Sequence, residues 1–209
     1  MHADTLLDIA MMHSDSLILR AQTGDRSAQG RLVQLWYKRI YNFCFKFFLD
    51  HDVAMESSQK TFIAMCRYIR DLQDTTRFKP WLYKIAYNNC REEARRHKAS
   101  RSMSFDLLWN PEEENSPEWE SNSAGDDPES QYRQAEVSAI LQKALGKIPP
   151  EQRAVIIMKE YEGLKFREIA EALGLSENTV KSRLYYGLEA LKKVLEKQNF
   201  NKNTLGYEL

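Results

Sequence analysis

The sequence predicts an all-α fold of two small helical domains joined by an acidic flexible linker, with a helix-turn-helix in the C-terminal domain. Apolar residues recur every three or four positions through most of the 209 residues, which is the spacing of one helix face. No stretch shows the two-residue alternation typical of a strand. Between the helical regions, residues 104–131 hold nine acids, three prolines and no Lys or Arg. Such a segment has too few apolar side chains to form a core.

Three long helices and a short leading one are expected before the linker. Apolar periodicity places the long helices at about 26–48, 53–70 and 79–97. Residues 71–78, with two Asp and two Thr, form the expected loop into the last of these helices. The predicted division is an N-terminal extension at 1–19, a first domain at 20–100, the linker at 101–131, a second domain at 132–197 and a tail at 198–209.

After the linker, an amphipathic helix at about 137–148 stops at Pro149-Pro150, because proline cannot continue a helix. A further helix is expected over 151–161. The helix-turn-helix follows, with Gly174 supplying the positive φ of the turn and Ser176 the N-cap of the second helix. The predicted buried stripe of that second helix comprises Val180, Leu184, Leu188, Leu191 and Leu195.

The opposite face of the second helix carries short polar, cationic and aromatic side chains. Groups of these types reach phosphates and base edges in a DNA major groove. A pair of surface helices with a solvated charged face is the alternative. The small residue, the glycine and the apolar residues at these offsets favour a helix-turn-helix that binds DNA. The candidate DNA-binding residues here are Asn178, Lys181, Ser182, Arg183, Tyr185 and Tyr186.

The helix at 79–97 mixes aromatic and cationic side chains along one face that we expect to be exposed. Such a face suits single-stranded DNA, since unpaired bases stack on aromatic rings while cations hold the backbone. In the structural alternative, Trp81 and Tyr87 cap the core and the arginines are only solvated. The candidate residues are Trp81, Tyr83, Lys84, Tyr87, Asn88, Arg91, Arg95 and Arg96.

Composition adds several exclusions. The net charge of zero conceals 17 Lys+Arg against 11 Asp+Glu in residues 1–103 and 13 against 10 in residues 132–209, on either side of the acidic segment. The three cysteines have neither zinc-site nor disulfide spacing, so reduced thiols are expected. No signal peptide or membrane span is visible. No catalytic or phosphate-binding motif occurs. A cytoplasmic, non-enzymatic protein with no metal and no cofactor is the expectation.

Three stretches resemble one family. Ala54-Met-Glu-Ser-Ser-Gln-Lys-Thr-Phe62 is similar to D-A-E-D-L-V-Q-E-T-F, and Phe78-Lys-Pro-Trp-Leu-Tyr-Lys-Ile-Ala-Tyr-Asn88 to F-x-x-W-L-x-x-I-A-x-N. Leu145-Gly-Lys-Ile-Pro-Pro-Glu-Gln-Arg-Ala-Val155, with the helix-turn-helix after it, matches L-x-x-L-P-x-x-x-R-x-V and T-V-K-S-R-L. With these three stretches in this order, the chain resembles a bacterial RNA polymerase sigma factor of the sigma-70 family, in the extracytoplasmic-function (ECF) group. The resemblance covers residues 20–98 (region 2) and 134–196 (region 4).

The resemblance implies a transcription initiation factor that binds core RNA polymerase and promoter DNA. It implies that Glu56, Gln59 and Phe62 dock on the clamp helices of the largest polymerase subunit. Loop 71–78 and the helix carrying Asn88 would capture flipped bases of the −10 element and promote melting, and the recognition helix would face the −35 element. Whether an anti-sigma factor restrains the protein is left open, as is whether the two domains pack together in the free protein.

Departures from the family pattern limit this transfer. Val53, Met55 and Lys60 stand where acids are usual, and Lys165 replaces a capping Ser or Thr. Tyr186 and Leu188 replace two arginines, so the promoter preference of other members does not carry over. The competing hypothesis is a helix-turn-helix regulator with a ligand- or signal-sensing N-terminal domain, which leaves Phe78–Asn88 without a role.

Overall fold

Within the described residues, 15–103 and 128–197, every regular element is helical, which confirms the predicted all-α class. This computed structural model places side chains over 15–96 and 136–197. The tail, the N-terminal residues to 14 and most of the expected linker lie outside the described residues. The elements are α2 (Asp15–Gln22), α3 (Arg26–Phe48), α4 (His51–Tyr68), η1 (Ile69–Asp71), η2 (Thr75–Arg77), α5 (Phe78–Met103), α6 (Pro128–Gly146), α7 (Pro150–Ile156), the π-turn η3 (Ile157–Tyr161), α8 (Phe166–Leu173) and α9 (Glu177–Lys197).

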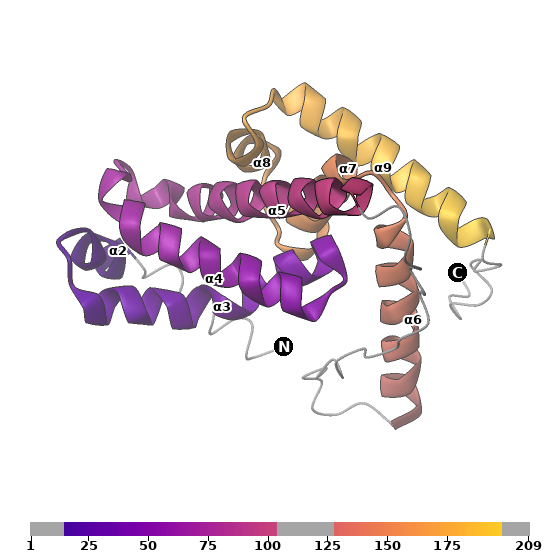
Figure 1. Ribbon diagram of the computed structural model, residues 1–209, viewed down its shortest axis with the longest axis horizontal. Coiled ribbons are helices and arrows are strands. Elements are labelled where there is room, and N and C mark those ends of the chain that lie inside the picture. Colours follow the sequence, from indigo (N-terminus) through magenta and orange to yellow (C-terminus); the bar gives the residue numbers. More distant parts are fainter. Residues whose placement is uncertain (1–14, 104–127, 198–209) are drawn as a thin grey trace.

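The N-terminal helices α2 to α5 pack around large aromatic side chains. The Asp25 carboxylate caps α3 by accepting from the backbone amides of Ser27 and Ala28, and Asp50 caps α4 by accepting from Val53. Inside, Trp36 meets Phe78 edge to face, at 5.6 Å between ring centroids. These caps and contacts fix α3, α4 and α5 side by side (Figure 1).

Two helix bounds differ from the sequence expectation at the edges of the linker. Helix α5 continues to Met103 rather than ending near 97, and α6 begins at Pro128, well before the expected 137. Polar residues flank the apolar stripe in both places, and periodicity cannot locate a helix end that has no apolar residue. The proposed domain bounds stay a prediction.

The C-terminal helices cross closely at Gly187. Helix α9 buries Val180 and Gly187, whereas Leu188 is 42% exposed, so the predicted stripe is wrong at Leu188. A Cβ at residue 187 would lie 3.0 Å from Ile156 Cδ1 and 3.1 Å from Gln152 Cβ. The glycine therefore allows α7 and α9 to touch, and the buried stripe follows Gly187 rather than its leucine neighbour.

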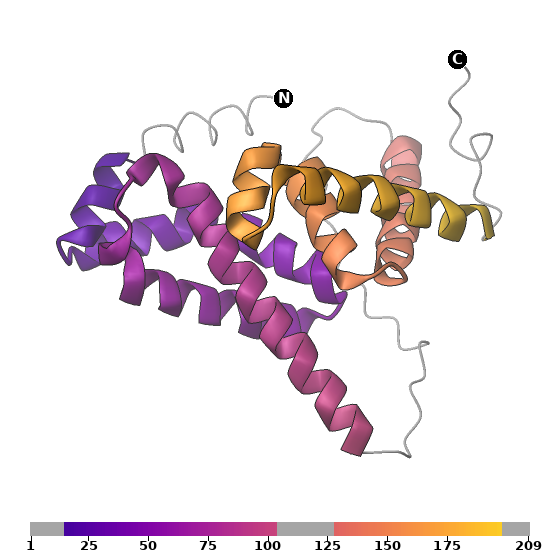
Figure 2. The same ribbon diagram turned by 90° about the horizontal axis from the view of Figure 1, so that it is seen from above.

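The N-terminal and C-terminal helices pack directly on each other. Helix α8 lies against α5, and α6, α7 and η3 contact α3. One apolar core runs through both groups, from Trp36 and Phe43 to Met158 and Ile169. In Figure 2, α5 crosses beneath the helix-turn-helix and its C-terminal end projects away from the other helices. We call this packing of the two groups the closed arrangement.

The close crossing predicts the effect of a matched pair of substitutions. Gly187→Val should lower the free energy of unfolding by about 1–3 kcal/mol, because the added side chain overpacks the contact with Ile156. Gly30→Val is the control, since no atom lies within 4 Å of a Cβ there. Urea denaturation of both variants measures the difference. Equal stability of the two variants would contradict the crossing.

Candidate nucleic-acid interface

Local geometry sets the angle between α8 and α9. Gly174 takes φ 66° and ψ 38° as the C-cap of α8, in the left-handed region as the sequence predicted. Ser176 Oγ accepts from the Thr179 amide at 3.1 Å, which confirms the predicted N-cap. At the start of α8, Lys165 offers no side-chain acceptor, but its own amide donates to the Glu168 carboxylate at 2.6 Å. The helix-turn-helix is thus fixed at both ends of α8.

The recognition face of α9 is open to solvent. Tyr185 and Tyr186 are 66% and 58% exposed, and their rings meet edge to face at 5.6 Å. Lys181 Nζ lies 5.7 Å from the centroid of the Phe166 ring. Arg183 differs, because it is half-buried and interacts with Tyr87 of α5. The exposed members of the predicted set are Asn178, Lys181, Ser182, Tyr185 and Tyr186.

The aromatic residues of the candidate single-strand face of α5 are largely buried, as the structural alternative expected for Trp81 and Tyr87. Tyr83 and Tyr87 are 0% and 4% exposed, and Trp81 is half-buried against the core. Arg96 forms ion pairs with Glu92 at 2.7 Å and Glu93 at 3.6 Å. The exposed members of the predicted set are Lys84, Asn88, Arg91, Arg95 and Arg96.

A polar cluster lies where the C-terminal helices cover α5. Glu162, 8% exposed, accepts a hydrogen bond from the Tyr83 hydroxyl at 2.5 Å, and its backbone carbonyl accepts from Lys79 Nζ at 2.9 Å. Lys46 of α3 is 4% exposed, and its Nζ lies 4.8 Å from the centroid of the Tyr161 ring. Sequence reasoning missed Glu162, because no periodic pattern marks the position.

Burial shifts the pKa of three groups in this cluster, Glu162, Lys46 and Tyr83. It raises the pKa of the Glu162 carboxyl, although the Tyr83 hydroxyl and the positive charges of Lys46, Arg39 and Lys79 act in the opposite direction. It lowers the pKa of the Lys46 ammonium, against the attraction of Glu162. Burial and the nearby carboxylate hold the pKa of Tyr83 well above its usual value. The cluster therefore joins the two halves of the chain at an electrostatic cost.

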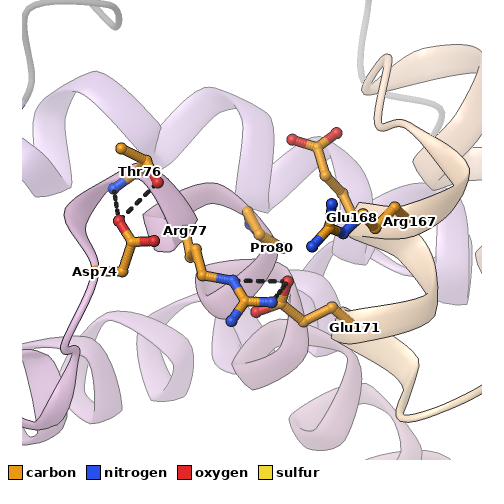
Figure 3. A pocket seen from close by; sticks show the side chains of 7 residues that line it. All are labelled: Asp74, Thr76, Arg77, Pro80, Arg167, Glu168 and Glu171. Atoms are coloured by element: carbon orange, nitrogen blue, oxygen red, sulfur yellow. Dashed lines mark hydrogen bonds and ion pairs between the residues drawn. The ribbon is translucent and has the colours of Figure 1, made fainter.

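A cleft of about 370 Å³ opens between the loop before α5 and helix α8. Figure 3 shows the Arg77 guanidinium pointing at Glu171 across the cleft. Arg77 Nη2 and Nε lie 2.7 and 3.1 Å from Glu171 Oε2. On the other side, Asp74 caps η2 by accepting from the amide and hydroxyl of Thr76 at 3.0 and 2.6 Å. The loop that is expected to hold flipped bases is thus ordered against α8.

Arg153 forms a second tie between the halves. Its Nη1 donates to the carbonyl of Phe47 in α3, and its Nη2 to the carbonyls of Gly146 at 2.6 Å and Ile148 at 3.1 Å. The guanidinium also lies 5.9 Å from the centroid of the Phe47 ring. The arginine of the third sequence motif therefore satisfies helix-end carbonyls in both halves.

The predicted polymerase-binding residues lie on α4 but do not share one exposed face. Glu56 and Gln59 are exposed, whereas Phe62 is 6% exposed and stacks on Tyr37 at 6.1 Å. Lys60 pairs with Glu56 at 2.6 Å and Glu93 at 2.9 Å. Ile63, 61% exposed, lies beside Phe62 in sequence and was not among the predicted residues, because periodicity does not show which apolar residues stay exposed.

Other site classes find little support in the described residues. Within 15–96 and 136–197, no three His, Cys, Asp or Glu side chains gather as metal ligands would. No helix in the described part of the chain is long and apolar enough to cross a membrane. Cys44 and Cys90 are free thiols with sulfur atoms 3.7 Å apart in the core.

Comparison with known proteins agrees with this geometry. The sigma-70 region 2 model matches residues 32–100, and the sigma-70 region 4 model matches residues 138–191. The chain is 31% identical over 181 residues to the ECF RNA polymerase sigma factor SigE of Mycolicibacterium smegmatis. This alignment covers 85% of this chain and 66% of SigE. The chain is also 28% identical over 178 residues to the ECF RNA polymerase sigma factor SigW of Bacillus subtilis. That alignment covers 85% of this chain and 94% of SigW.

A solved structure shares the fold. The sigma factor RpoE, in its complex with the anti-sigma factor NepR from Bartonella quintana, aligns with a TM-score of 0.62 at 19% identity, covering 80% of this chain and 96% of that one. The fold, the two family models and the similarity to these relatives all lead to the same family. The chain belongs to the sigma-70 family of RNA polymerase sigma factors, in its extracytoplasmic-function group.

Proposed function

We propose that this sigma factor reads a promoter through two surfaces, one for duplex DNA on α9 and one for unpaired bases on α5. The observation that supports the proposal is that one chain has both of these surfaces. An exposed tyrosine- and lysine-bearing recognition helix accompanies a second helix whose aromatic and cationic groups suit single strands. Region 4 would bind the −35 element, and region 2 would capture the −10 element and promote melting.

The duplex-reading role is supported by the exposed face of α9. Lys181 offers a charge to phosphates, and Tyr185 and Tyr186 project polar hydroxyls from a fixed helix. Arg183 faces α5 in the closed arrangement, so its role at the −35 element requires α9 to leave α5. Promoter preference would therefore depend on tyrosines rather than on the two arginines usual in the family.

The single-strand role is supported by Asn88, Lys84 and Arg91, which are exposed on α5 beside the half-buried Trp81. An aromatic ring with neighbouring cations can stack one base and hold its backbone. Arg77 and the loop before α5 precede the same helix and line the cleft against α8. Together these groups form a surface that a helix-turn-helix alone does not provide.

The partners follow from the family. Core RNA polymerase would dock on α4 around Glu56 and Gln59, with Met55 and Ile63 adding exposed apolar surface at 38% and 61%. Phe62 would support that face from beneath, because it is buried. An anti-sigma factor is a further proposed partner, as the sigma factor RpoE was solved with NepR.

Run-off transcription tests the proposed function. Genomic fragments transcribed by core polymerase plus this protein should give specific start sites that disappear when the protein is left out. Gel filtration should show the protein migrating with core. The proposal would be overturned if no start site in a whole-genome library depended on the protein and the protein did not migrate with core.

Substitutions on α5 should separate melting from duplex binding. Asn88→Ala and Trp81→Ala should reduce strand opening by roughly tenfold, because each base stacked or held contributes about 1–3 kcal/mol. Permanganate reactivity of promoter thymines measures opening. Gln34→Ala, which removes an exposed amide from α3, is the control. Trp81→Ala also requires a thermal melt, and wild-type reactivity in both variants would assign these residues a structural role alone.

Substitutions on α9 should separate affinity from base preference. Lys181→Ala should weaken binding similarly at all promoters and reduce the salt slope by about one. Lys192→Ala, another exposed lysine of α9, is the matched control. Tyr186→Arg should add a guanine preference of about 1–3 kcal/mol at one position. Selection from a randomised −35 library measures this, and an unchanged preference would mean that residue 186 does not face bases.

A further inference from the structure

Helix α9 exposes an apolar patch beside its polar recognition residues. Of the nine large hydrophobic side chains that are exposed in the described residues, three fall within four consecutive positions of α9. These are Tyr185, Tyr186 and Leu188, which are 66%, 58% and 42% exposed. A single exposed leucine needs no explanation, but apolar side chains that gather on one surface mark a place of contact with another molecule. The patch is therefore a candidate contact surface.

The close crossing at Gly187 keeps Leu188 on this surface. Gly187 is buried where α9 meets α7, and a Cβ there would lie 3.0 Å from Ile156 Cδ1. Successive residues of a helix point about 100° apart, so this crossing directs Leu188 sideways, out of the contact with α7. The helix register therefore fixes where the leucine projects.

Leu188 shares a stripe of α9 with residues that the proposed function assigns to duplex DNA. It follows Lys181 by seven residues and Tyr185 by three, and all three side chains are exposed. Seven residues are about two helical turns, so Lys181 and Leu188 point within roughly 20° of each other and lie about 10 Å apart along the axis. Base-reading residues of helix-turn-helix domains recur over a similar length of the recognition helix. Leu188 thus lies on the side of α9 that would face the bases.

A leucine on that side suits one feature of the major groove. The groove edges of guanine, adenine and cytosine present only hydrogen-bond donors and acceptors, and a leucine side chain can pair with none of them. Thymine adds a 5-methyl group, which an apolar side chain can shield from water. An arginine, the residue usual in the family at this position, would instead hold a guanine or a phosphate. The leucine therefore favours a methyl group over a polar base edge.

We propose that Leu188 is a specificity-determining residue of α9, which selects thymine in the −35 element through the 5-methyl group of that base. The inference rests on the proposed function, from which it takes the reading of duplex DNA by α9. Lys181 offers charge to phosphates, a contribution that weakens with salt and is similar for every sequence. Leu188 adds an apolar contact, whose contribution depends on the base. The two residues thus have separable effects.

Deoxyuridine tests the inference, because it pairs with adenine as thymidine does and lacks only the 5-methyl group. The full chain bound to core RNA polymerase first selects a preferred −35 element from a randomised duplex library. Each thymidine of that element is then replaced in turn by deoxyuridine, and fluorescence anisotropy measures the affinity of the holoenzyme for each duplex. Leu188→Ala and Leu188→Met are compared with Leu19→Ala, which makes the same truncation at an exposed leucine of α2.

One deoxyuridine replacement should weaken binding of the wild type by roughly fourfold, the effect of losing one buried methyl group. Leu188→Ala should bind the thymidine and deoxyuridine duplexes equally at that position. Leu188→Met keeps an apolar side chain and should discriminate as the wild type does, and so should Leu19→Ala. Circular dichroism should show intact helices in every variant, because the replaced side chains are exposed and alanine favours a helix.

Three results would overturn the inference and leave the proposed function intact. They are a selected −35 element without thymine, equal affinity of the wild type for thymidine and deoxyuridine at every position, and the same discrimination in Leu188→Ala as in the wild type. A holoenzyme that prefers no duplex sequence would instead count against the proposed function, and the inference would fail with it.

Discussion

The packing of the two helical halves on one apolar core, with the Tyr83–Glu162 hydrogen bond where they meet, is the constraint on which the rest of this structure depends. This hydrogen bond lies where α5 of region 2 meets the turn before α8 of region 4, and one apolar core continues on both sides of it. A carboxylate is buried only where donors compensate for the lost water. The Tyr83 hydroxyl and the positive charges of Lys46 and Lys79 fulfil that role. This site, the Arg77–Glu171 pair and the shared apolar core together set the position of the helix-turn-helix relative to α5.

The same site relates fold to function. Region 2 and region 4 each carry a proposed DNA-binding surface, and joining them in one chain would raise the effective concentration of the second contact. A tethered pair gains this advantage only if both surfaces are available together. In the closed arrangement the tyrosines of α9 are exposed, whereas Tyr83 and Tyr87 of α5 are buried against aromatic rings of α3. Lys84, Asn88 and Arg91 of α5 remain exposed, so both proposed surfaces present groups to solvent.

The sequence predicted local features well, because each has a local cause. The bounds of α3, the φ of Gly174 and the cap at Ser176 all depend on neighbours within a few residues. It failed where a distant element decides burial. Periodicity marks a face of α5 but not which rings of α3 pack on it, so Tyr83 was expected to be exposed. Leu188 was likewise assigned to the core. The crossing with α7 makes Gly187 the buried position instead, and the sequence does not show that crossing.

Hydroxyl-radical footprinting of the full chain, alone and bound to core RNA polymerase, tests the central claim most directly. The free protein should show little oxidation at Tyr87, which the closed arrangement buries, and strong oxidation at Tyr185, which it exposes. Binding to core should raise the oxidation of Tyr87 and leave Tyr185 reactive, because separation of the halves would remove Arg183 of α9 from Tyr87. Equal oxidation of Tyr87 in the free and bound protein would contradict the account.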